Sequence, residues 1–210
     1  MDTILIIMIE LTKKYKSGSA LEILQEAILF GDIPEGISLT QNELAESLGT
    51  SRMPVREALI ALEYQGLVKK HTNQHVNVAA LTDNDIHAVF SDLAVLEFEV
   101  LKTFAEDELS VLSACMTQEE YHRTLCAKTE APLRRRTLGT MTGVYLSFVL
   151  ANAEDRGKLD AVFTNLQEAV KNPADPEILR ACYAVYAEVL SLELLQIRKR
   201  RKENAELEAG

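Results

Sequence analysis

The most constraining feature of the sequence is a pair of helix signals between residues 40 and 66, separated by a very short turn. Thr40–Glu43 reads Thr-Gln-Asn-Glu, a capping box in which the threonine hydroxyl and the glutamate carboxylate satisfy each other's backbone N–H groups. The helix it starts ends at Gly49. Ser51 is a good N-cap for the next helix, which tolerates Pro54 in its first turn and stops at Gly66. Two helices joined this closely predict a helix-turn-helix.

Elements on both sides extend this pair into a larger unit. Apolar residues recur at helical spacing from Ser19 to Phe30, and Gly31 follows as a stop signal. After the pair, Leu67–Lys70 and Val76–Val78 are typical of two short strands around a polar tip. Three helices and a two-stranded wing are the order of a winged helix-turn-helix, which we assign to residues 1–80.

Residues 1–18 form a short extension of this domain with the apolar run Ile4–Ile9. The run is far too short to span a bilayer, and Asp2 stands where a secretory signal has basic residues. We expect it to pack on the body of the protein or on a second subunit. Three widely spaced cysteines without a metal-type spacing indicate free thiols in a reducing cytoplasm (Cys115, Cys126 and Cys182).

The second half, residues 81–210, shows no strand pattern and predicts an all-α helical bundle. Apolar positions keep helical spacing over many turns, for example Val89, Leu93, Leu96, Val100 and Phe104. Helices are expected at 82–105, 108–128, 133–152, 155–171 and 176–203. The chain is therefore predicted to be mainly α, with a winged helix-turn-helix followed by a helical domain for dimerisation and effector binding.

The net charge of −10 does not exclude a nucleic-acid partner. Affinity for DNA depends on local lysines and arginines that neutralise phosphates more than on the charge of the whole molecule. The first 80 residues carry Lys13, Lys14, Lys16, Arg52, Arg56, Lys69 and Lys70, and most of the acidic excess lies downstream. An acidic body behind a modest basic face is compatible with specific binding.

Arg52 and Arg56 are the strongest candidates for contact with DNA. They are four residues apart, so they share a face at the start of the third helix, where a recognition helix enters the major groove. The alternative is that they are surface charges paired with Glu57 or Glu63. Further candidate contacts come from the turn, the preceding helix and the wing: Thr50, Ser51, Met53, Thr40, Gln41, Asn42, Lys69, Lys70 and His71.

The run Gly49–Leu67, with Thr-Ser-Arg-Met-Pro-Val-Arg-Glu-Ala-Leu at 50–59, resembles the signature of GntR-family regulators. The resemblance extends over residues 19–80. It implies dimers that bind short palindromic double-stranded operators, with Arg52 and Arg56 reading or clamping the DNA. The family's wing tip usually carries glycines, whereas this chain has Asn73 and His75.

The helical half is similar, through Thr82-Asp83, Leu96-Glu97 and its helix order, to the C-terminal domain of the FadR-like subgroup, the FCD type. That resemblance implies a divalent metal held by one aspartate and three histidines. Here the residue four before His122 is Gln118, and the alternative register offers only Thr142 and Leu146. We therefore expect the metal site to be lost and no cofactor to be bound.

The sequence is compatible with two states of the effector site. It is either a metal-free pocket lined by His122, Leu146, Phe148 and Phe163, or it has closed and left a dimerisation bundle. His87, alone on the first long helix, is expected to be a surface or hydrogen-bonded residue. The basic run Arg134–Arg136 is expected to be solvated, with contact to an anionic effector as the alternative. The tail run Arg198–Lys202 is expected to complement the dipole of its own helix, with a DNA or partner contact as the alternative.

The sequence as a whole predicts a homodimeric, ligand-responsive repressor in the cytoplasm. An enzyme is not expected, because no activated nucleophile, glycine-rich phosphate loop or zinc-type spacing is visible and no catalytic residue is assigned. The competing hypothesis is a helical interaction protein whose winged helix contacts protein and not DNA. It predicts that Arg52 and Arg56 are dispensable.

Overall fold

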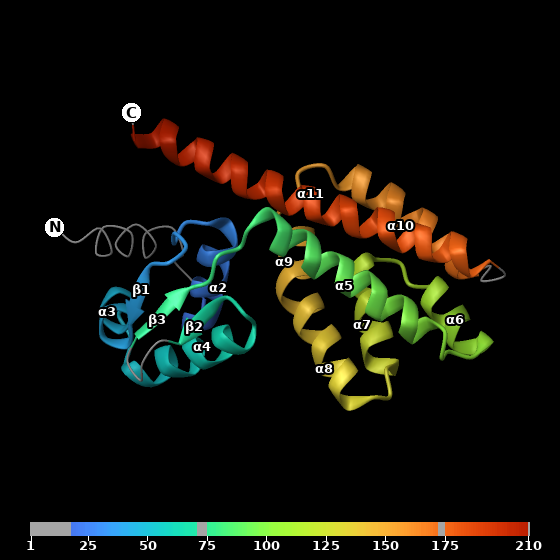
Figure 1. Cartoon of the computed structure of the whole chain (residues 1–210), viewed down its shortest axis with the longest axis horizontal. Helices are drawn as coiled ribbons and strands as arrows, with labels where there is room; N and C mark the ends of the chain where they lie inside the picture. The colour runs from blue at the N-terminus through green and yellow to red at the C-terminus, as the bar shows by residue number, and fades with distance from the viewer. Residues whose placement is uncertain (1–17, 71–74, 172–174, 210) are drawn as a thin grey trace. The chain divides into compact units, whose positions relative to one another are not determined.

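The structure is a computed structural model that describes residues 18–70, 75–171 and 175–209 (Figure 1). The chain divides into two compact units. One unit combines the residues up to Thr82 with those from Arg198 onwards, and the other is formed by Asp83–Ile197.

The N-terminal unit is a winged helix-turn-helix with a three-stranded sheet. Its elements are α2 (Ala20–Phe30), β1 (Ser38–Thr40), α3 (Gln41–Ser47), α4 (Arg52–Tyr64), β2 (Val68–Lys70) and β3 (His75–Val78). The strands are antiparallel in the order β1-β3-β2. Both predicted wing strands are present and pair with each other as β2 and β3, and β1 is a third strand that the sequence analysis did not predict. The three residues of β1 are too few to show an alternation of apolar and polar side chains. In addition, Thr40 both ends β1 and caps the next helix.

The predicted helix signals are present in the geometry. The Thr40 hydroxyl accepts a hydrogen bond from the Glu43 amide at 3.2 Å, and the Glu43 carboxylate accepts one from the Thr40 amide at 3.1 Å. Gly49 has a φ of 60°, the left-handed conformation that a side chain disfavours and that turns the chain from α3 into α4. Leu24, Leu44 and Leu62 are fully buried and hold the three helices together.

The C-terminal tail contributes to this unit through two arginines. Arg198 donates to the carbonyl oxygens of Ile28 and Leu29, at 3.1 and 2.8 Å, in the last turn of α2, where the Gly31 amide also donates to Ile28 at 3.0 Å. Arg201 forms a two-pronged contact with Asp32, the closest pair at 2.9 Å, and its guanidinium lies 4.4 Å from the centre of the Phe30 ring. The prediction that the basic run complements its own helix is wrong for these two residues, because they face the end of α2.

The second unit is entirely helical over its described residues. Its elements are α5 (Asp83–Leu101), α6 (Glu106–Ser113), α7 (Gln118–Lys128), α8 (Pro132–Met141), the π-helical segment η1 (Thr142–Leu146), α9 (Ser147–Asn152), α10 (Arg156–Lys171) and α11 (Pro176–Ala209), of which the part up to Ile197 belongs to this unit. The mainly α fold with a winged helix-turn-helix is confirmed. No helix in the described part of the chain is both long and apolar enough to cross a membrane.

Three predicted helix boundaries are corrected. The helix expected at 108–128 is two helices, because the chain breaks after Ser113 and Thr117 caps α7 through a hydrogen bond from the Glu120 amide. The helix expected at 133–152 contains the π-helical segment η1. The last helix runs to Ala209, beyond the expected end at residue 203.

Candidate nucleic-acid interface and helical core

The first turns of α4 present two arginines to solvent. Arg52 and Arg56 are both exposed, and neither makes an ion pair with any residue that the structure describes. The alternative in which Glu57 or Glu63 neutralises them is therefore not realised. Apolar side chains at Val55, Leu59 and Leu62 bury the opposite face of α4. This division of faces leaves both guanidinium groups available for an external acceptor.

The start of α4 also lacks a side-chain cap. Ser51 stands at the N-cap position with extended backbone, but its hydroxyl makes no capping hydrogen bond. Thr50 and Ser51 are exposed. A helix N-terminus with uncapped first-turn N–H groups attracts anions through those groups and through the helix dipole. A phosphate oxygen fits this position.

The three candidates at the start of α3 are placed differently from one another. The hydroxyl of Thr40 donates to the Glu43 carboxylate at 2.6 Å, so it is already engaged in the capping box. Gln41 is half-buried and has an interaction within the protein, whereas Asn42 is exposed. Of the three, the Asn42 amide is the one open to a phosphate.

The wing supplies further positive charge. Lys69 and Lys70 are exposed on β2, opposite Asn77 and Val76 of β3. His71, the remaining candidate, lies outside the described residues. On α4 itself, Met53, Ile60 and Tyr64 are 61%, 58% and 53% exposed. An apolar surface of this kind on a recognition helix suits thymine methyl groups or a protein partner.

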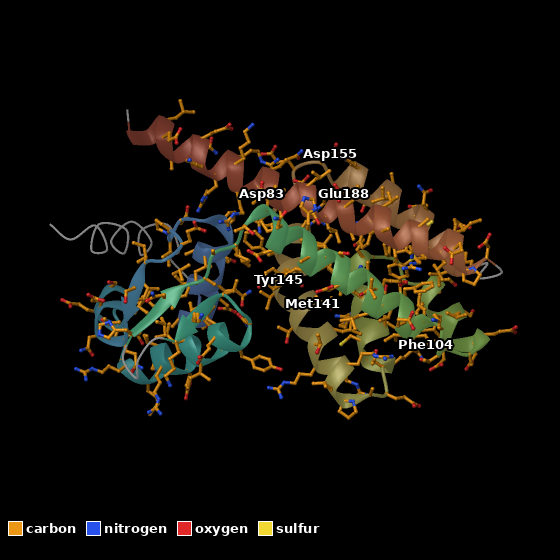
Figure 2. The ribbon with its side chains drawn as sticks, viewed as in Figure 1. Asp83, Phe104, Met141, Tyr145, Asp155 and Glu188 are labelled. Atoms are coloured by element: carbon orange, nitrogen blue, oxygen red, sulfur yellow. The ribbon has the colours of Figure 1, made fainter. Side chains whose placement is uncertain are left out.

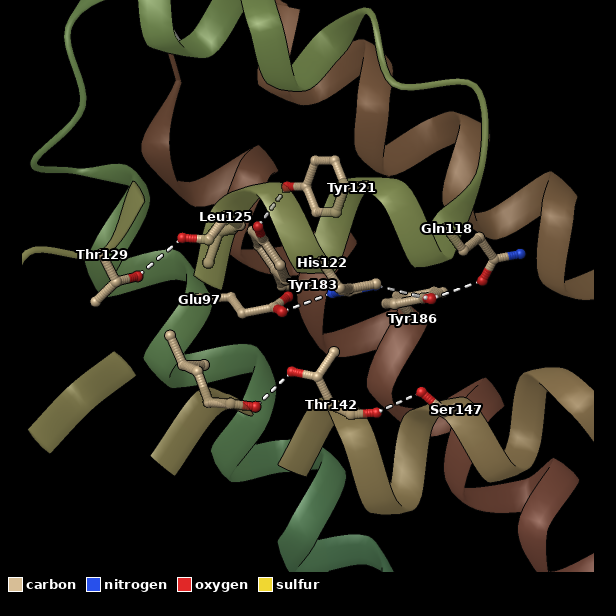
Figure 3. Close-up of polar contacts among 11 residues, drawn as sticks. Glu97, Gln118, Tyr121, His122, Leu125, Thr129, Thr142, Ser147, Tyr183 and Tyr186 are labelled. Atoms are coloured by element: carbon tan, nitrogen blue, oxygen red, sulfur yellow. Dashed lines mark hydrogen bonds and ion pairs between the residues drawn. The ribbon is translucent and has the colours of Figure 1, made fainter. Parts of the chain in front are cut away.

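The helical unit buries a chain of polar side chains from α5, α7 and α11 (Figure 3), and this chain ends at the exposed Asp160 of α10. His122 Nδ1 lies 2.6 Å from Glu97 Oε1, and His122 Nε2 lies 3.1 Å from the Tyr186 hydroxyl. That hydroxyl donates to Gln118 Oε1 at 2.6 Å, and Gln118 Nε2 donates to Asp160 at 2.8 Å. His122 is fully buried, and Glu97 and Gln118 are 1% and 6% exposed.

The donors in this chain can be assigned from one end. The Gln118 amide nitrogen must face the Asp160 carboxylate, because two oxygens would repel, so its carbonyl faces Tyr186. The Tyr186 hydroxyl donates its single proton to that carbonyl oxygen. His122 Nε2 must then be the donor to the Tyr186 oxygen, which requires a proton on Nε2. A second proton lies between His122 Nδ1 and Glu97, so the pair is either imidazolium with carboxylate or imidazole with carboxylic acid.

Aromatic rings enclose this chain of polar side chains and make its surroundings apolar. The Tyr121 and Tyr183 hydroxyls are 2.6 Å apart, and the His122 and Tyr186 rings stack with centroids 5.5 Å apart. Burial raises the pKa of Tyr121, Tyr183 and Tyr186 well above the ordinary tyrosine value, with the nearby Glu97 carboxylate adding to the effect. These phenols are therefore held in their neutral, hydrogen-bonding form.

The four predicted effector residues are only partly brought together. His122 and Phe163 have ring centroids 6.3 Å apart, and Phe163 lines a cavity of about 280 Å³ with Gln118, Arg156 and Asp160. Leu146 and Phe148 are buried on η1 and α9 and do not line this cavity.

The side chains around His122 do not fit a divalent metal. Both ring nitrogens of His122 already have partners, and the Gln118 carbonyl accepts the Tyr186 proton. Over the described residues, no three His, Cys, Asp or Glu side chains are grouped closely enough to hold a metal ion. The donor set is that of a hydrogen-bonded core and not of a coordination site.

Sequence reasoning missed Glu97 and Tyr186 as partners of His122. A signal was present for Glu97, because it falls in the apolar stripe of α5 between Leu93 and Val100, where an acid needs a partner. His87 was predicted to be a surface or hydrogen-bonded residue, and its Nδ1 atom lies 3.4 Å from Oε2 of Glu188 on α11. Nothing in the spacing along the chain pointed to Tyr186, which lies 64 residues beyond His122.

Comparison with known proteins supports the assignment of the N-terminal domain. Residues 16–78 match the model of the bacterial regulatory proteins of the gntR family. An uncharacterized HTH-type transcriptional regulator of Bacillus subtilis (strain 168), YdhC, is 31% identical over 101 residues, which are 46% of this chain and 45% of that protein. A second, from an unstable DNA locus of Streptomyces ambofaciens, is 48% identical over 46 residues, 22% of this chain and 20% of that protein. The matched region thus spans half or less of these relatives.

Solved structures show the same fold at low identity. The Listeria monocytogenes protein Lar, described as controlling the expression of the agr system, has a TM-score of 0.53 at 17% identity, with 84% of this chain and 95% of that chain covered. A Rhodococcus sp. RHA1 protein described as a GntR transcriptional regulator has a TM-score of 0.50 at 19% identity, with the same coverage. The fold and the exposed arginine helix define a winged-helix protein with a helical second domain. Its helix-turn-helix is of the gntR type, as the sequence predicted.

Proposed function

We propose that this protein is a site-specific DNA-binding transcription regulator. The observation that carries the proposal is the pair of exposed arginines on the first turns of α4, unpaired among the described residues and next to an uncapped helix N-terminus. Planar guanidinium groups bind guanine edges or phosphates through two hydrogen bonds at once. The match of residues 16–78 to the gntR family supports the same conclusion.

The contacts fall into two groups by their chemistry. Arg52, Arg56 and Met53 stand where a helix meets base edges in the major groove, and they provide sequence reading. Thr50, Ser51, Asn42, Lys69 and Lys70 present hydroxyl, amide and ammonium donors to phosphates, and they set the position of the domain on the duplex. Thr40 and Gln41 contribute mainly by shaping the start of α3.

In finer detail, we propose that the regulator is a homodimer that binds a palindromic operator, represses transcription and responds to a small-molecule effector. For the effector we favour the cavity beside Phe163, because its wall includes Gln118 and Asp160, the outer end of the polar chain. A ligand that accepts a hydrogen bond from the Gln118 amide or donates one to the Asp160 carboxylate would alter the chain without a metal. The proposed regulator needs no catalysis and no cofactor, and we propose that it acts in the cytoplasm. The assignment of the second domain to the FadR-like subgroup is part of the same proposal.

A second function is favoured by one observation. Met53, Ile60 and Tyr64 form an exposed apolar surface on α4, which also suits a protein partner. In that case the winged helix docks onto protein, and Arg52 and Arg56 contribute little to its activity.

The deciding experiment is fluorescence anisotropy with sequences selected from a random DNA pool. Arg52→Ala and Arg56→Ala should each weaken binding by about 1–3 kcal/mol, and the wild-type affinity should fall steeply with salt. Lys158→Ala, an exposed charge on α10, is the matched control and should bind normally. Selection without enrichment, or full affinity in both arginine variants, overturns the proposal in favour of the protein-binding function.

A further inference from the structure

We propose that the cavity beside Phe163 binds a free α-amino acid with an apolar side chain. The inference rests on the proposed function, which places the effector in this cavity, and it deepens that function by naming the chemical class of the ligand. The groups that carry it come from α7, α9 and α10, all within the helical unit.

The cavity is small and has buried apolar side chains in its wall. Its volume of about 280 Å³ lies near the lower limit of about 300 Å³ for small-molecule pockets, so it fits a small metabolite and not a nucleotide. Leu150, Leu159 and Phe163 line it and are 4%, 1% and 4% exposed. These three side chains offer an apolar surface to one part of the ligand.

The start of α7 offers two backbone donors at this cavity. Thr117, Gln118 and Glu119 all line it, and α7 begins at Gln118. The Thr117 hydroxyl accepts a hydrogen bond from the Glu120 amide at 3.1 Å. The Gln118 and Glu119 amides, by contrast, donate to no group in the described part of the chain. N–H groups at the positive end of a helix dipole bind carboxylates.

Arg156 adds a full positive charge to the same cavity. It is the first residue of α10 and directly follows Asp155, which Figure 2 labels. One guanidinium nitrogen donates to the carbonyl oxygen of Leu150. The guanidinium forms no ion pair with Asp155 or with any other residue that the structure describes. Its remaining N–H groups can hold a carboxylate through two hydrogen bonds at once.

Two carboxylates line the cavity without neutralising this arginine. Asp160 lies one turn after Arg156 on α10, so the two side chains share a face of that helix, and Glu119 comes from α7. Among the described residues, neither carboxylate forms an ion pair. Asp160 accepts the Gln118 hydrogen bond through Oδ1, and Oδ2 makes none. An ammonium group is the donor that suits both carboxylates.

A zwitterion satisfies both kinds of charge at once. An α-amino acid carries its carboxylate and its ammonium on a single carbon, and side chains one turn apart on a helix have Cβ atoms about 5–6 Å apart. The ligand carboxylate therefore pairs with Arg156, and its ammonium pairs with Asp160. A simple carboxylic acid would place its charge beside two carboxylates without compensation, and a simple amine would leave Arg156 unpaired.

The ligand ammonium would act on the buried polar chain through Gln118. Figure 3 shows the Gln118 carbonyl oxygen on the Tyr186 hydroxyl and the Gln118 nitrogen directed away from it. That nitrogen donates to Asp160 at 2.8 Å, so a ligand that donates to Asp160 competes with it. Occupation of the cavity is thereby linked to Tyr186 and to His122 behind it.

The test is isothermal titration calorimetry of the full chain, without DNA, against L-valine, L-leucine, L-methionine and L-phenylalanine. At least one of them should bind. For leucine, the matched analogues are isocaproate, which lacks the ammonium, and isoamylamine, which lacks the carboxylate. Each analogue should bind at least about tenfold more weakly than the amino acid, because one charged contact is lost.

Two variants should remove these preferences one at a time. Arg156→Gln should weaken binding of the amino acid at least about tenfold and leave the amine unchanged. Asp160→Asn keeps an oxygen for Gln118, and it should weaken the amino acid while the carboxylic acid binds no worse than before. Lys158→Ala, an exposed site on α10 that does not line the cavity, should bind like wild type.

Failure of all four amino acids to bind at millimolar concentration overturns the proposal, and so does an isocaproate affinity equal to that of leucine. Arg52→Ala should bind the amino acid normally, so loss of DNA binding and loss of ligand binding are distinguished. Amino-acid binding that leaves the DNA affinity of the wild type unchanged would support the site and overturn its role as the effector site.

Discussion

The two units of this protein differ in where they hold their polar groups: the helical unit buries them, and the N-terminal unit exposes them. The six buried polar side chains among the described residues all belong to the helical unit: Glu97, Gln118, His122, Thr129, Ser191 and Glu193. The N-terminal unit has an apolar core, and its candidate functional groups, such as Arg52 and Arg56, are exposed. The first arrangement specifies the interior of a domain, and the second leaves charge available for a partner.

This difference determines what a mutation should do in each unit. An exposed arginine contributes little to folding, so its loss should appear in binding alone. A buried and hydrogen-bonded charge cannot lose its partner without a desolvation cost, so its loss should appear in stability. Unfolding measurements on each unit therefore test this difference.

The largest effect should come from His122→Leu. The substitution leaves the Glu97 carboxyl buried at 1% exposure without its partner at 2.6 Å, which should cost about 3–5 kcal/mol in urea unfolding of the helical unit. The double variant Glu97→Leu/His122→Leu removes both polar groups and should regain most of that loss. A single-variant cost below about 1 kcal/mol, or a double variant less stable than the single one, would show that the pair is not a buried couple.

Alkaline pH should separate the units next. Burial raises the pKa of Tyr121, Tyr183 and Tyr186 above its unfolded value of about 10, so the folded state keeps protons that the unfolded state releases. The stability they contribute is complete below pH 10 and is lost as the pH rises, by about 1 kcal/mol per tyrosine over the first pH unit. Unfolding followed by circular dichroism at several pH values measures this loss. Tyr64→Phe, at an exposed position in the other unit, should leave the pH dependence unchanged, and a flat profile would contradict the burial of the three phenols.

The same contrast explains how much of the molecule was predictable from sequence. Caps, glycine stops and the paired arginines of the N-terminal domain act over three or four residues, so Thr40–Glu43 and Arg52 with Arg56 were visible in the sequence. The polar chain joins Glu97, His122 and Tyr186 across 25 and 64 residues, and no local pattern encodes such pairings. Strand β1 was missed because it obtains its pairing from β3, more than thirty residues away, as in Leu39 with Val76.

A smaller effect should follow from loss of the tail contact in the N-terminal unit. Arg201→Ala removes a two-pronged ion pair whose side chains are 25% and 11% exposed, and we expect a loss of about 1–2 kcal/mol in unfolding of that unit. Lys202→Ala, an exposed neighbour, should change stability by less than about 0.5 kcal/mol. Hydrogen exchange at the end of α2 should rise in the first variant only. Equal exchange in both variants would mean that the tail does not hold the end of α2.

The smallest effect should come from Thr40→Ala, which tests whether the Thr40 hydroxyl serves folding, DNA binding or both. Its hydroxyl donates to Glu43 at 2.6 Å and accepts from the Glu43 amide at 3.2 Å, so Thr40→Ala should cost about 1 kcal/mol of stability through loss of the cap. Thr40→Ser keeps the hydroxyl and should retain the wild-type stability. If Thr40 acts only as a cap, DNA affinity measured well below the unfolding transition should be the same in both variants. If alanine weakens binding while serine does not, the hydroxyl also contacts phosphate, and the capping box is part of the interface.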